Sequence, residues 1–257
     1  MRLKLAVAGK GGVGKTTLSA ALARALARRG EPVMAVDADP NNCLGRALGF
    51  PESTLRLVKP LSEMREELAA LAGTSEGGGF FSINPPVEQL LSDYQIEHDG
   101  VSLLVMGTID EPGAGCVCPE SAILKALVRH LVGLEQTAVI MDMEAGLEHL
   151  GRGTARHIGA LLIVTEPAPA SARTATRIGR LARGLGLQVA GVVINKANSP
   201  GDEEKVRPYL EEVDIIASLP FDPAIAASES AVPSGPYAQA VEKLLADVSA
   251  MAAGARA

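Results

Sequence analysis

The protein is a chain of 257 residues with 24 lysines and arginines against 30 aspartates and glutamates, a formal net charge of −6. This balance argues against non-specific binding to nucleic acid or to an anionic membrane, because both require a positive surface. Apolar residues make up 47% of the chain, which is enough for a buried core and argues against disorder.

The number of cysteines and the first apolar run indicate in which cellular compartment the protein is expected. Three cysteines are too few for a disulfide framework, and Cys116 and Cys118 are separated by a single residue, a spacing poorly suited to a simple bridge. The first apolar run ends in a glycine-rich segment that contains lysine, so it is not a signal-peptide core. No other run approaches the length of a membrane span. We therefore expect a soluble protein of the reducing cytoplasm.

Short apolar runs alternate with longer amphipathic segments along the chain. The runs predict strands buried on both faces, at 3–8, 33–36, 101–106, 138–141, 160–164, 189–194 and 215–219. Apolar residues at helical spacing predict helices at 16–29, 119–132, 171–184 and 237–251. The alternation predicts βαβ units and hence an α/β fold with a doubly wound, mainly parallel sheet flanked by helices.

The segment from about residue 50 to residue 99 departs from this alternation. A helix is expected over 62–71, and it is followed by a run of glycines, a pair of phenylalanines and a pair of prolines. We interpret the segment as an insertion with a small hairpin at the edge of the sheet. Since no repeat or linker divides the chain, residues 1–257 are expected to form a single domain.

The residues directly after the first predicted strand fit the phosphate-binding pattern GxxxxGK[ST]. They are Gly9, Lys10, Gly11, Gly12, Val13, Gly14, Lys15, Thr16 and Thr17. Glycines let the backbone wrap a polyphosphate with its N–H groups toward the anion, and Lys15 adds charge at the β and γ phosphates. The hydroxyl of Thr16 is expected to ligate Mg²⁺. The pattern predicts a P-loop NTPase.

Acidic residues follow two other predicted strands. Asp37 and Asp39 come after the second strand, where they either face Mg²⁺ and an attacking water or serve as turn and helix-capping residues. Asp142 directly follows the apolar run at 138–141, as a Walker B carboxylate bound to Mg²⁺ through water requires. The sequence therefore predicts a magnesium site beside the phosphates.

Two later strands also end in polar residues. Asn195 ends one strand, and Pro220 and Asp222 follow the next. Both positions belong to the carboxyl edge of the expected sheet, where ligands bind in this architecture. For Asp222, capping of a helix remains an alternative to a contact with the ligand.

The sequence GKGGVGKT at residues 9–16 resembles the deviant Walker A motif of a family of ATPases. That family includes the nitrogenase iron protein, the cell-division ATPase MinD, chromosome-partitioning ATPases and metal-insertion ATPases. The resemblance implies a single P-loop ATPase domain whose Lys10 reaches the phosphates of a partner across a nucleotide-sandwich dimer. It also implies that Asp39 in switch I orients the hydrolytic water, that residues 142–146 form switch II, and that segments at Asn195 and Pro220 hold the adenine.

Cys116 and Cys118 lie between a predicted strand and a predicted helix. In an extended backbone residues i and i+2 point to the same side, so both sulfurs can bind one metal ion. Two thiolates are half of the usual four-ligand set of zinc or nickel, and a twofold axis would supply the rest. The alternative is a pair of ordinary small residues.

The sequence around this pair, GAGCVCPE at 113–120, and residues 142–154 resemble accessory ATPases of the CooC type, which help to insert nickel into carbon monoxide dehydrogenase. The resemblance implies a homodimer that hydrolyses ATP with Mg²⁺, binds Ni²⁺ and also Zn²⁺ at the paired cysteines, and serves a nickel-requiring dehydrogenase. Neither nucleic acid nor a membrane is an expected partner. The open alternatives are an accessory ATPase for acetyl-CoA synthase, an iron–sulfur redox ATPase like the nitrogenase iron protein, and a positioning switch of the MinD or partitioning class.

Overall fold

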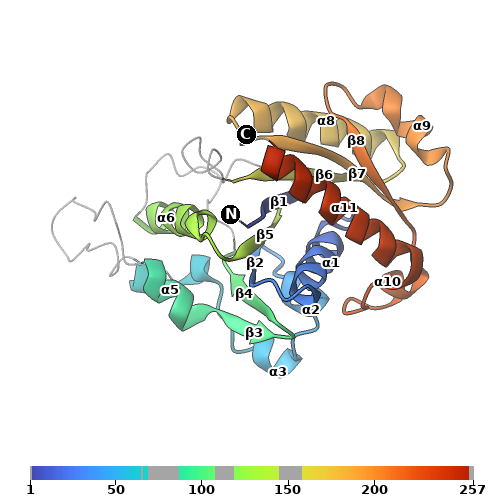
Figure 1. The fold of residues 1–257 in the computed structure, drawn as a ribbon. Coiled ribbons are helices and arrows are strands. Elements are labelled where there is room, and N and C mark those ends of the chain that lie inside the picture. The colour runs from blue at the N-terminus through green and yellow to red at the C-terminus, as the bar shows by residue number, and fades with distance from the viewer. Residues whose placement is uncertain (1, 65, 69–86, 108–118, 145–157, 255–257) are drawn as a thin grey trace.

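The computed structural model describes residues 2–64, 66–68, 87–107, 119–144 and 158–254 (Figure 1). Strands of these residues form one sheet: β1 (Lys4–Gly9), β2 (Val33–Ala38), β3 (Ile96–His98), β4 (Val101–Val105), β5 (Ala138–Met143), β6 (Ala160–Thr165), β7 (Val189–Ala197) and β8 (Ile215–Pro220). Their helices are α1 (Lys15–Arg28), α2 (Leu44–Ala47), α3 (Glu52–Leu55), α5 (Val87–Tyr94), α6 (Pro119–Gly133), α8 (Pro169–Gly184), α9 (Asp202–Val206), α10 (Pro223–Ala227) and α11 (Gly235–Gly254).

The sheet has the strand order β3-β4-β2-β5-β1-β6-β7-β8. The pairing of β3 with β4 is antiparallel, and the other neighbouring strands run parallel. Strands β2 to β5 all lie on one side of β1, and β6 to β8 lie on the other, so the chain changes sides of the sheet at β1. Ligands of doubly wound sheets bind outside the carboxyl ends of the strands at such a point. The predicted fold class is confirmed.

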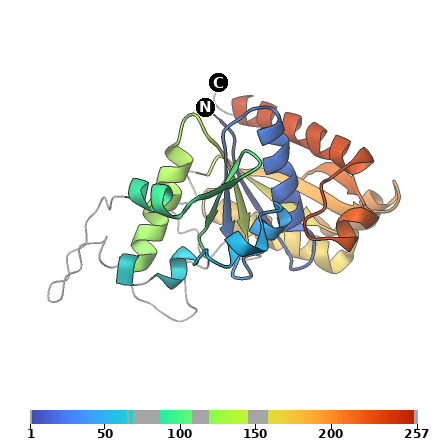
Figure 2. The same cartoon turned by 90° about the horizontal axis from the view of Figure 1, so that it is seen from below.

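Helices cover the sheet on both faces. The helices α1 and α11 lie side by side on one face, and α6 and α8 pack on the other (Figures 1 and 2). Neighbouring residues of β1 enter different cores, Leu5 that of α1 and α11 and Ala6 that of α6 and α8, because successive strand side chains point to opposite faces. Within the described ranges no helix is long and apolar enough to cross a membrane.

The strand β8 corrects one prediction. It was expected to be buried on both faces, yet Ser218 is exposed and its neighbours Ile216 and Ala217 are only partly buried. The reason is its position, because β8 forms one edge of the sheet and has a strand neighbour on a single side.

The other edge carries the expected hairpin of the insertion. Strands β3 and β4 pair through the turn Asp99-Gly100, whose φ angles are 48° and 76°. Positive φ at both central residues is the requirement of a two-residue type I′ turn. Of the helix expected over 62–71, the described residues contain a 3₁₀ turn at Leu61–Glu63 and a helical segment at 66–68, and 69–71 lie outside them.

Candidate functional site

The P-loop connects the end of β1 to the start of α1, and two of its glycines lie against other strands. A Cβ atom at Gly9 would lie 2.4 Å from the carbonyl oxygen of Val164, and one at Gly14 would lie 2.3 Å from Nδ2 of Asn195. Gly14 also has φ 93° and is the N-cap residue of α1, without a side-chain cap among the described residues. Because the first turn of α1 contains no acidic residue, its N–H groups are suited to an anionic ligand.

The two lysines of the P-loop occupy different environments. Lys15 is 7% exposed, and its Nζ lies 3.9 Å from Oδ2 of Asp39. Lys10 is exposed to solvent on the outside of the loop, as are Gly11 and Gly12. Lys15 is thus oriented toward the acidic residues of its own chain, whereas Lys10 is available to a molecule outside it.

Asp142 at the end of β5 is fully buried beside the first turns of α1. Its Oδ2 accepts a hydrogen bond of 2.6 Å from Oγ1 of Thr16, and its Oδ1 accepts one of 3.0 Å from Oγ of Ser19. Burial raises the pKa of Asp142 to about 6, against the effect of these hydrogen bonds and of Lys15. Ser19 was not predicted, although it follows Thr16 by three residues and so lies on the same helix face.

Asp37 is fully buried on β2, next to Asp142 on β5, and connects two loops. Its carboxylate accepts hydrogen bonds from the backbone N–H groups of Leu44, at 2.9 Å, and Asp39, at 3.3 Å. Its backbone oxygen accepts hydrogen bonds from the N–H groups of Met106, at 2.8 Å, and Gly107, at 3.2 Å. Burial, to which the nearby Asp142 and Asp39 add, raises the pKa of Asp37 to about 7.

Asp39 begins the loop predicted to be switch I. Its Oδ1 accepts hydrogen bonds of 2.9 Å from both the backbone N–H and the Nδ2 of Asn41, which makes it a turn residue as the alternative interpretation expects. Its Oδ2 is the oxygen that faces Lys15. One carboxylate therefore shapes the loop and also reaches Lys15 of the P-loop.

The ends of β7 and β8 border a cavity of about 200 Å³ next to the P-loop. Its lining comprises Gly12, Gly14, Thr17, Asn195, Lys196, Pro220, Phe221, Asp222, Ile225, Ala226 and Tyr237. Asn195 donates a hydrogen bond of 2.9 Å from Nδ2 to the backbone oxygen of Val13, whereas its buried Oδ1 has no partner among the described residues. Asp222 lines the cavity and also caps α10, since its Oδ1 accepts a hydrogen bond of 2.9 Å from the N–H of Ala224. Asp222 thus caps a helix as the alternative expects, and its contact with a ligand stays a prediction.

The contacts of Lys196 in this region were not predicted from the sequence. The Nζ of Lys196 donates a hydrogen bond of 2.6 Å to the backbone oxygen of Gly12 and lies 3.5 Å from Oε2 of Glu166. The available signal was its position immediately after Asn195 at the carboxyl edge of the sheet. The P-loop is consequently held by two neighbouring residues of β7.

The predicted cysteine site, Cys116 and Cys118, lies outside the described residues. In the part of the chain that is described, no three His, Cys, Asp or Glu side chains form a group that could hold a metal ion. Cys43 is a partly buried free thiol at the start of α2.

The residues that are described fit a magnesium nucleotide. The hydroxyl of Thr16 and the carboxylate of Asp142 supply the oxygen atoms that Mg²⁺ prefers. The uncapped start of α1 and the buried Lys15 suit phosphates, and the unpartnered Oδ1 of Asn195 is an acceptor for a base amino group.

Comparison with known proteins agrees with this geometry. Residues 4–232 match the family described as the CobQ/CobB/MinD/ParA nucleotide binding domain. The chain belongs to this family of nucleotide-binding proteins, and the family resemblance of its P-loop is confirmed.

Individual proteins of similar sequence or structure can also be named. It is 43% identical to the carbon monoxide dehydrogenase accessory protein CooC of Rhodospirillum rubrum, over 89% of this chain and 88% of that protein. It is 40% identical to an uncharacterized ATP-binding protein of Methanocaldococcus jannaschii, over 88% of each chain. The septum site-determining protein MinD of Pyrococcus horikoshii, solved with Mg-ADP, shares the fold with a TM-score of 0.67 at 23% identity and covers 100% of this chain and 99% of its own.

Proposed function

We propose that the protein is a homodimeric nickel chaperone that hydrolyses ATP with Mg²⁺ and so supports the insertion of nickel into carbon monoxide dehydrogenase. The observation that carries this proposal is the 43% identity to the accessory protein CooC over 89% of the chain. The conjunction of a P-loop with a Cys-x-Cys pair adds support, because it unites an energy source and soft metal ligands in one chain. Residues 1–257, with an insertion at about 50–99, act as a single cytoplasmic domain.

The proposed hydrolysis transfers the γ-phosphoryl group of ATP to water and leaves ADP and phosphate. Lys15, and Lys10 of the opposite protomer, stabilise negative charge on the transferring group, while Asp39 orients the attacking water. Thr16 and Asp142, which share a hydrogen bond of 2.6 Å, would hold Mg²⁺, and the ion would neutralise charge on the phosphates. The exposure of Lys10 supports its action across a dimer.

The nucleotide is held by backbone and by the cavity beside the P-loop. Backbone N–H groups of the loop cradle the phosphates, with contributions from Gly9, Gly11, Gly12, Val13, Gly14 and Thr17. The Oδ1 of Asn195 accepts a hydrogen bond from the adenine amino group, and Pro220 and Asp222 form a wall of the base pocket. The buried, unpartnered state of Oδ1 supports this role.

Nickel is the cargo of the proposed cycle. Cys116 and Cys118 from each of two protomers supply four thiolates, the number that nickel and zinc commonly take. ATP binding closes the dimer and brings the pairs together, so nucleotide and metal affinities are linked.

The test is metal binding by protein stripped with a chelator. Equilibrium dialysis against Ni²⁺, with and without Mg-ATP, should give about one Ni²⁺ per dimer for the wild type, as expected from four ligands. The double variant Cys116→Ser/Cys118→Ser should lose this binding, and Cys43→Ser is the matched control that retains it. Undiminished nickel binding by the double variant would refute the proposal.

The client enzyme requires a separate measurement. Nickel-depleted carbon monoxide dehydrogenase and nickel-depleted acetyl-CoA synthase are each incubated with the nickel-loaded protein and Mg-ATP. We expect activation of the dehydrogenase, and activation of the synthase alone would assign the protein to that enzyme instead.

A further inference from the structure

Lys196 at the end of β7 has no role in the hydrolysis described above, yet it contacts the P-loop directly. We infer that Lys196 is a positioning residue, which together with Asn195 fixes the backbone of the P-loop in its phosphate-binding orientation. The inference rests on the nucleotide-binding part of the proposed function and is independent of nickel.

The geometry is a pair of parallel contacts. Two neighbouring residues, Asn195 and Lys196, donate to two neighbouring carbonyls, Val13 at 2.9 Å and Gly12 at 2.6 Å. These contacts join segments separated by 182 and 184 residues in the sequence. The donors are thus supplied by the sheet rather than by the loop itself.

Because the peptide group is planar, the hydrogen bonds to the Gly12 and Val13 carbonyls also fix the direction of the neighbouring N–H groups. Within a trans peptide the carbonyl of one residue points opposite to the N–H of the next. Holding the carbonyls of Gly12 and Val13 toward β7 therefore turns the N–H groups of Val13 and Gly14 away from it. The N–H of Val13 also donates to the backbone oxygen of Lys10 at 3.4 Å, so the orientation of the Gly14 N–H carries the argument. Successive N–H groups with a fixed common direction are what an anion-binding loop requires.

The backbone of Lys196 is itself in an unusual conformation. Its φ is 59°, in the left-handed region that is uncommon for a residue other than glycine. Surrounding hydrogen bonds hold it there, since the N–H of Phe221 donates to the oxygen of Ala197 at 2.8 Å and Nδ2 of Asn198 donates to the oxygen of Lys196 at 3.2 Å. A conformation of higher energy that the neighbouring structure maintains is typical of functional positions.

Glu166, which follows β6, provides a second contact for the ammonium group. Its Oε2 lies 3.5 Å from Nζ, and the side chains of Lys196 and Glu166 are 40% and 34% exposed. A pair this exposed contributes little to stability. Its effect is to orient Nζ, so removing the Glu166 carboxylate should weaken the hydrogen bond from Lys196 to the Gly12 oxygen without abolishing it.

The experiment titrates Mg-ADP into wild type and into Lys196→Met by calorimetry and also measures steady-state ATP hydrolysis. We expect the Kd of Lys196→Met to rise about tenfold, because a hydrogen bond from a charged donor is lost. Its kcat at saturating ATP should stay within about twofold, since the residue does not touch the reacting atoms. Lys196→Arg should restore most of the affinity, and Glu166→Gln should raise the Kd about threefold.

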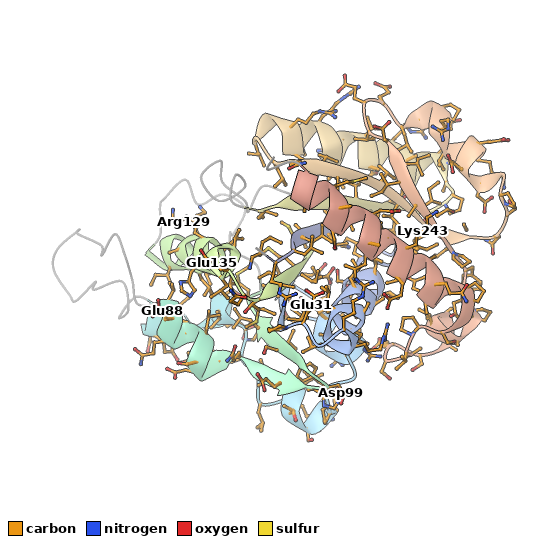
Figure 3. All side chains as sticks on the ribbon, in the orientation of Figure 1. Glu31, Glu88, Asp99, Arg129, Glu135 and Lys243 are labelled. Atoms are coloured by element: carbon orange, nitrogen blue, oxygen red, sulfur yellow. The ribbon has the colours of Figure 1, made fainter. Side chains whose placement is uncertain are left out.

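The matched control is Lys243→Met, which removes the same charge from the exposed outer side of α11 (Figure 3). It should leave Kd, kcat and the urea midpoint unchanged. If Lys196→Met lowers the urea midpoint, Lys196→Gln, which keeps a donor group but no charge, is measured instead and is expected to raise the Kd at an unchanged midpoint.

Each outcome decides one question. A wild-type Kd in a folded Lys196 variant overturns the inference and leaves the proposed function intact. A lower kcat at unchanged Kd also overturns it, because the residue would then act in the chemical step. Absence of nucleotide binding by the wild type overturns the proposed function instead.

Discussion

Thr16 donates a hydrogen bond of 2.6 Å to Asp142, and this contact joins the first turn of α1 to the end of β5 across 126 residues of sequence. The magnesium site of the proposed hydrolysis is therefore assembled from the start of a helix and the end of a strand, which the pairing of β1 with β5 brings together.

Asp142→Asn tests this assembly. The amide keeps an oxygen to accept the hydrogen bond from Thr16 but removes the negative charge that attracts Mg²⁺, so ATP hydrolysis should fall about a hundredfold. Phosphate release over a range of Mg²⁺ concentrations measures the effect. Ser19→Ala is the control, because it removes one hydrogen bond to Asp142 and leaves the carboxylate in place. Equal losses in the two variants would contradict the role of the charge.

Gly14→Ala should abolish nucleotide binding. An added Cβ would lie 2.3 Å from Nδ2 of Asn195, and φ is 93°, so both the side-chain contact and the backbone conformation oppose the change. The left-handed backbone alone costs an L-residue about 1–2 kcal/mol. Calorimetry with Mg-ADP and urea unfolding check this expectation. Gly133→Ala is the control, because no atom lies within 4 Å of its added Cβ and its φ is ordinary.

Lys10→Ala should separate nucleotide binding from dimer formation. Lys10 is exposed while Lys15 is buried beside Asp39, so the variant should bind Mg-ATP with nearly the wild-type affinity. It should fail to form the dimer that Mg-ATP induces, because the opposite protomer loses its cation. Light scattering with and without Mg-ATP measures the mass directly. A stable Mg-ATP dimer of the variant would show that Lys10 is dispensable.

Tyr237→Phe should stabilise the protein without nucleotide. Tyr237 is 3% exposed, and its hydroxyl has no hydrogen-bond partner among the described residues. Burial, with a smaller contribution from Asp222, raises the pKa of Tyr237, so the hydroxyl stays neutral. Removing an unsatisfied buried hydroxyl should increase the free energy of unfolding by about 1 kcal/mol. Urea unfolding without nucleotide measures the change, and a decrease would reveal a partner for the hydroxyl.

Lys4→Met should destabilise the end of α6. Lys4 is 2% exposed, and its Nζ donates to the backbone oxygens of Leu131, Leu134 and Thr137 at 3.3, 2.5 and 2.6 Å. Hydrogen bonds to charged groups contribute about 1.5–3 kcal/mol each, so the unfolding free energy should fall by at least about 2 kcal/mol. Lys243→Met, measured by the same urea titration, should show no change. A loss below the uncertainty of that titration would mean that water replaces the ammonium group.

The order of elements could be predicted from the sequence because it depends on local signals. Apolar runs marked the strands at 33–36 and 138–141, and the GKGGVGKT pattern marked the turn between β1 and α1. The exposure of β8 could not be predicted in this way, since an edge strand and a central strand have similar apolar runs and differ only in their neighbours.

The site shows the same division. Lys15, Thr16 and Asp142 were predicted, because each belongs to a pattern of fixed spacing next to a strand. The contacts of Ser19 with Asp142 and of Lys196 with Gly12 join residues far apart in the chain. Which distant side chain reaches Asp142 or Gly12 depends on how the sheet packs, so no local sequence pattern specifies either contact.

Asp37 serves two loops at once, because its carboxylate accepts hydrogen bonds from the loop that follows β2 and its carbonyl accepts them from the end of β4. The chain that continues from Gly107 leads within nine residues to Cys116. A displacement of either loop by itself would cost hydrogen bonds in the buried interior, whereas a joint movement conserves them. The loop that begins at Asp39 and the chain that leaves β4 through Met106 and Gly107 are thus held by one buried aspartate.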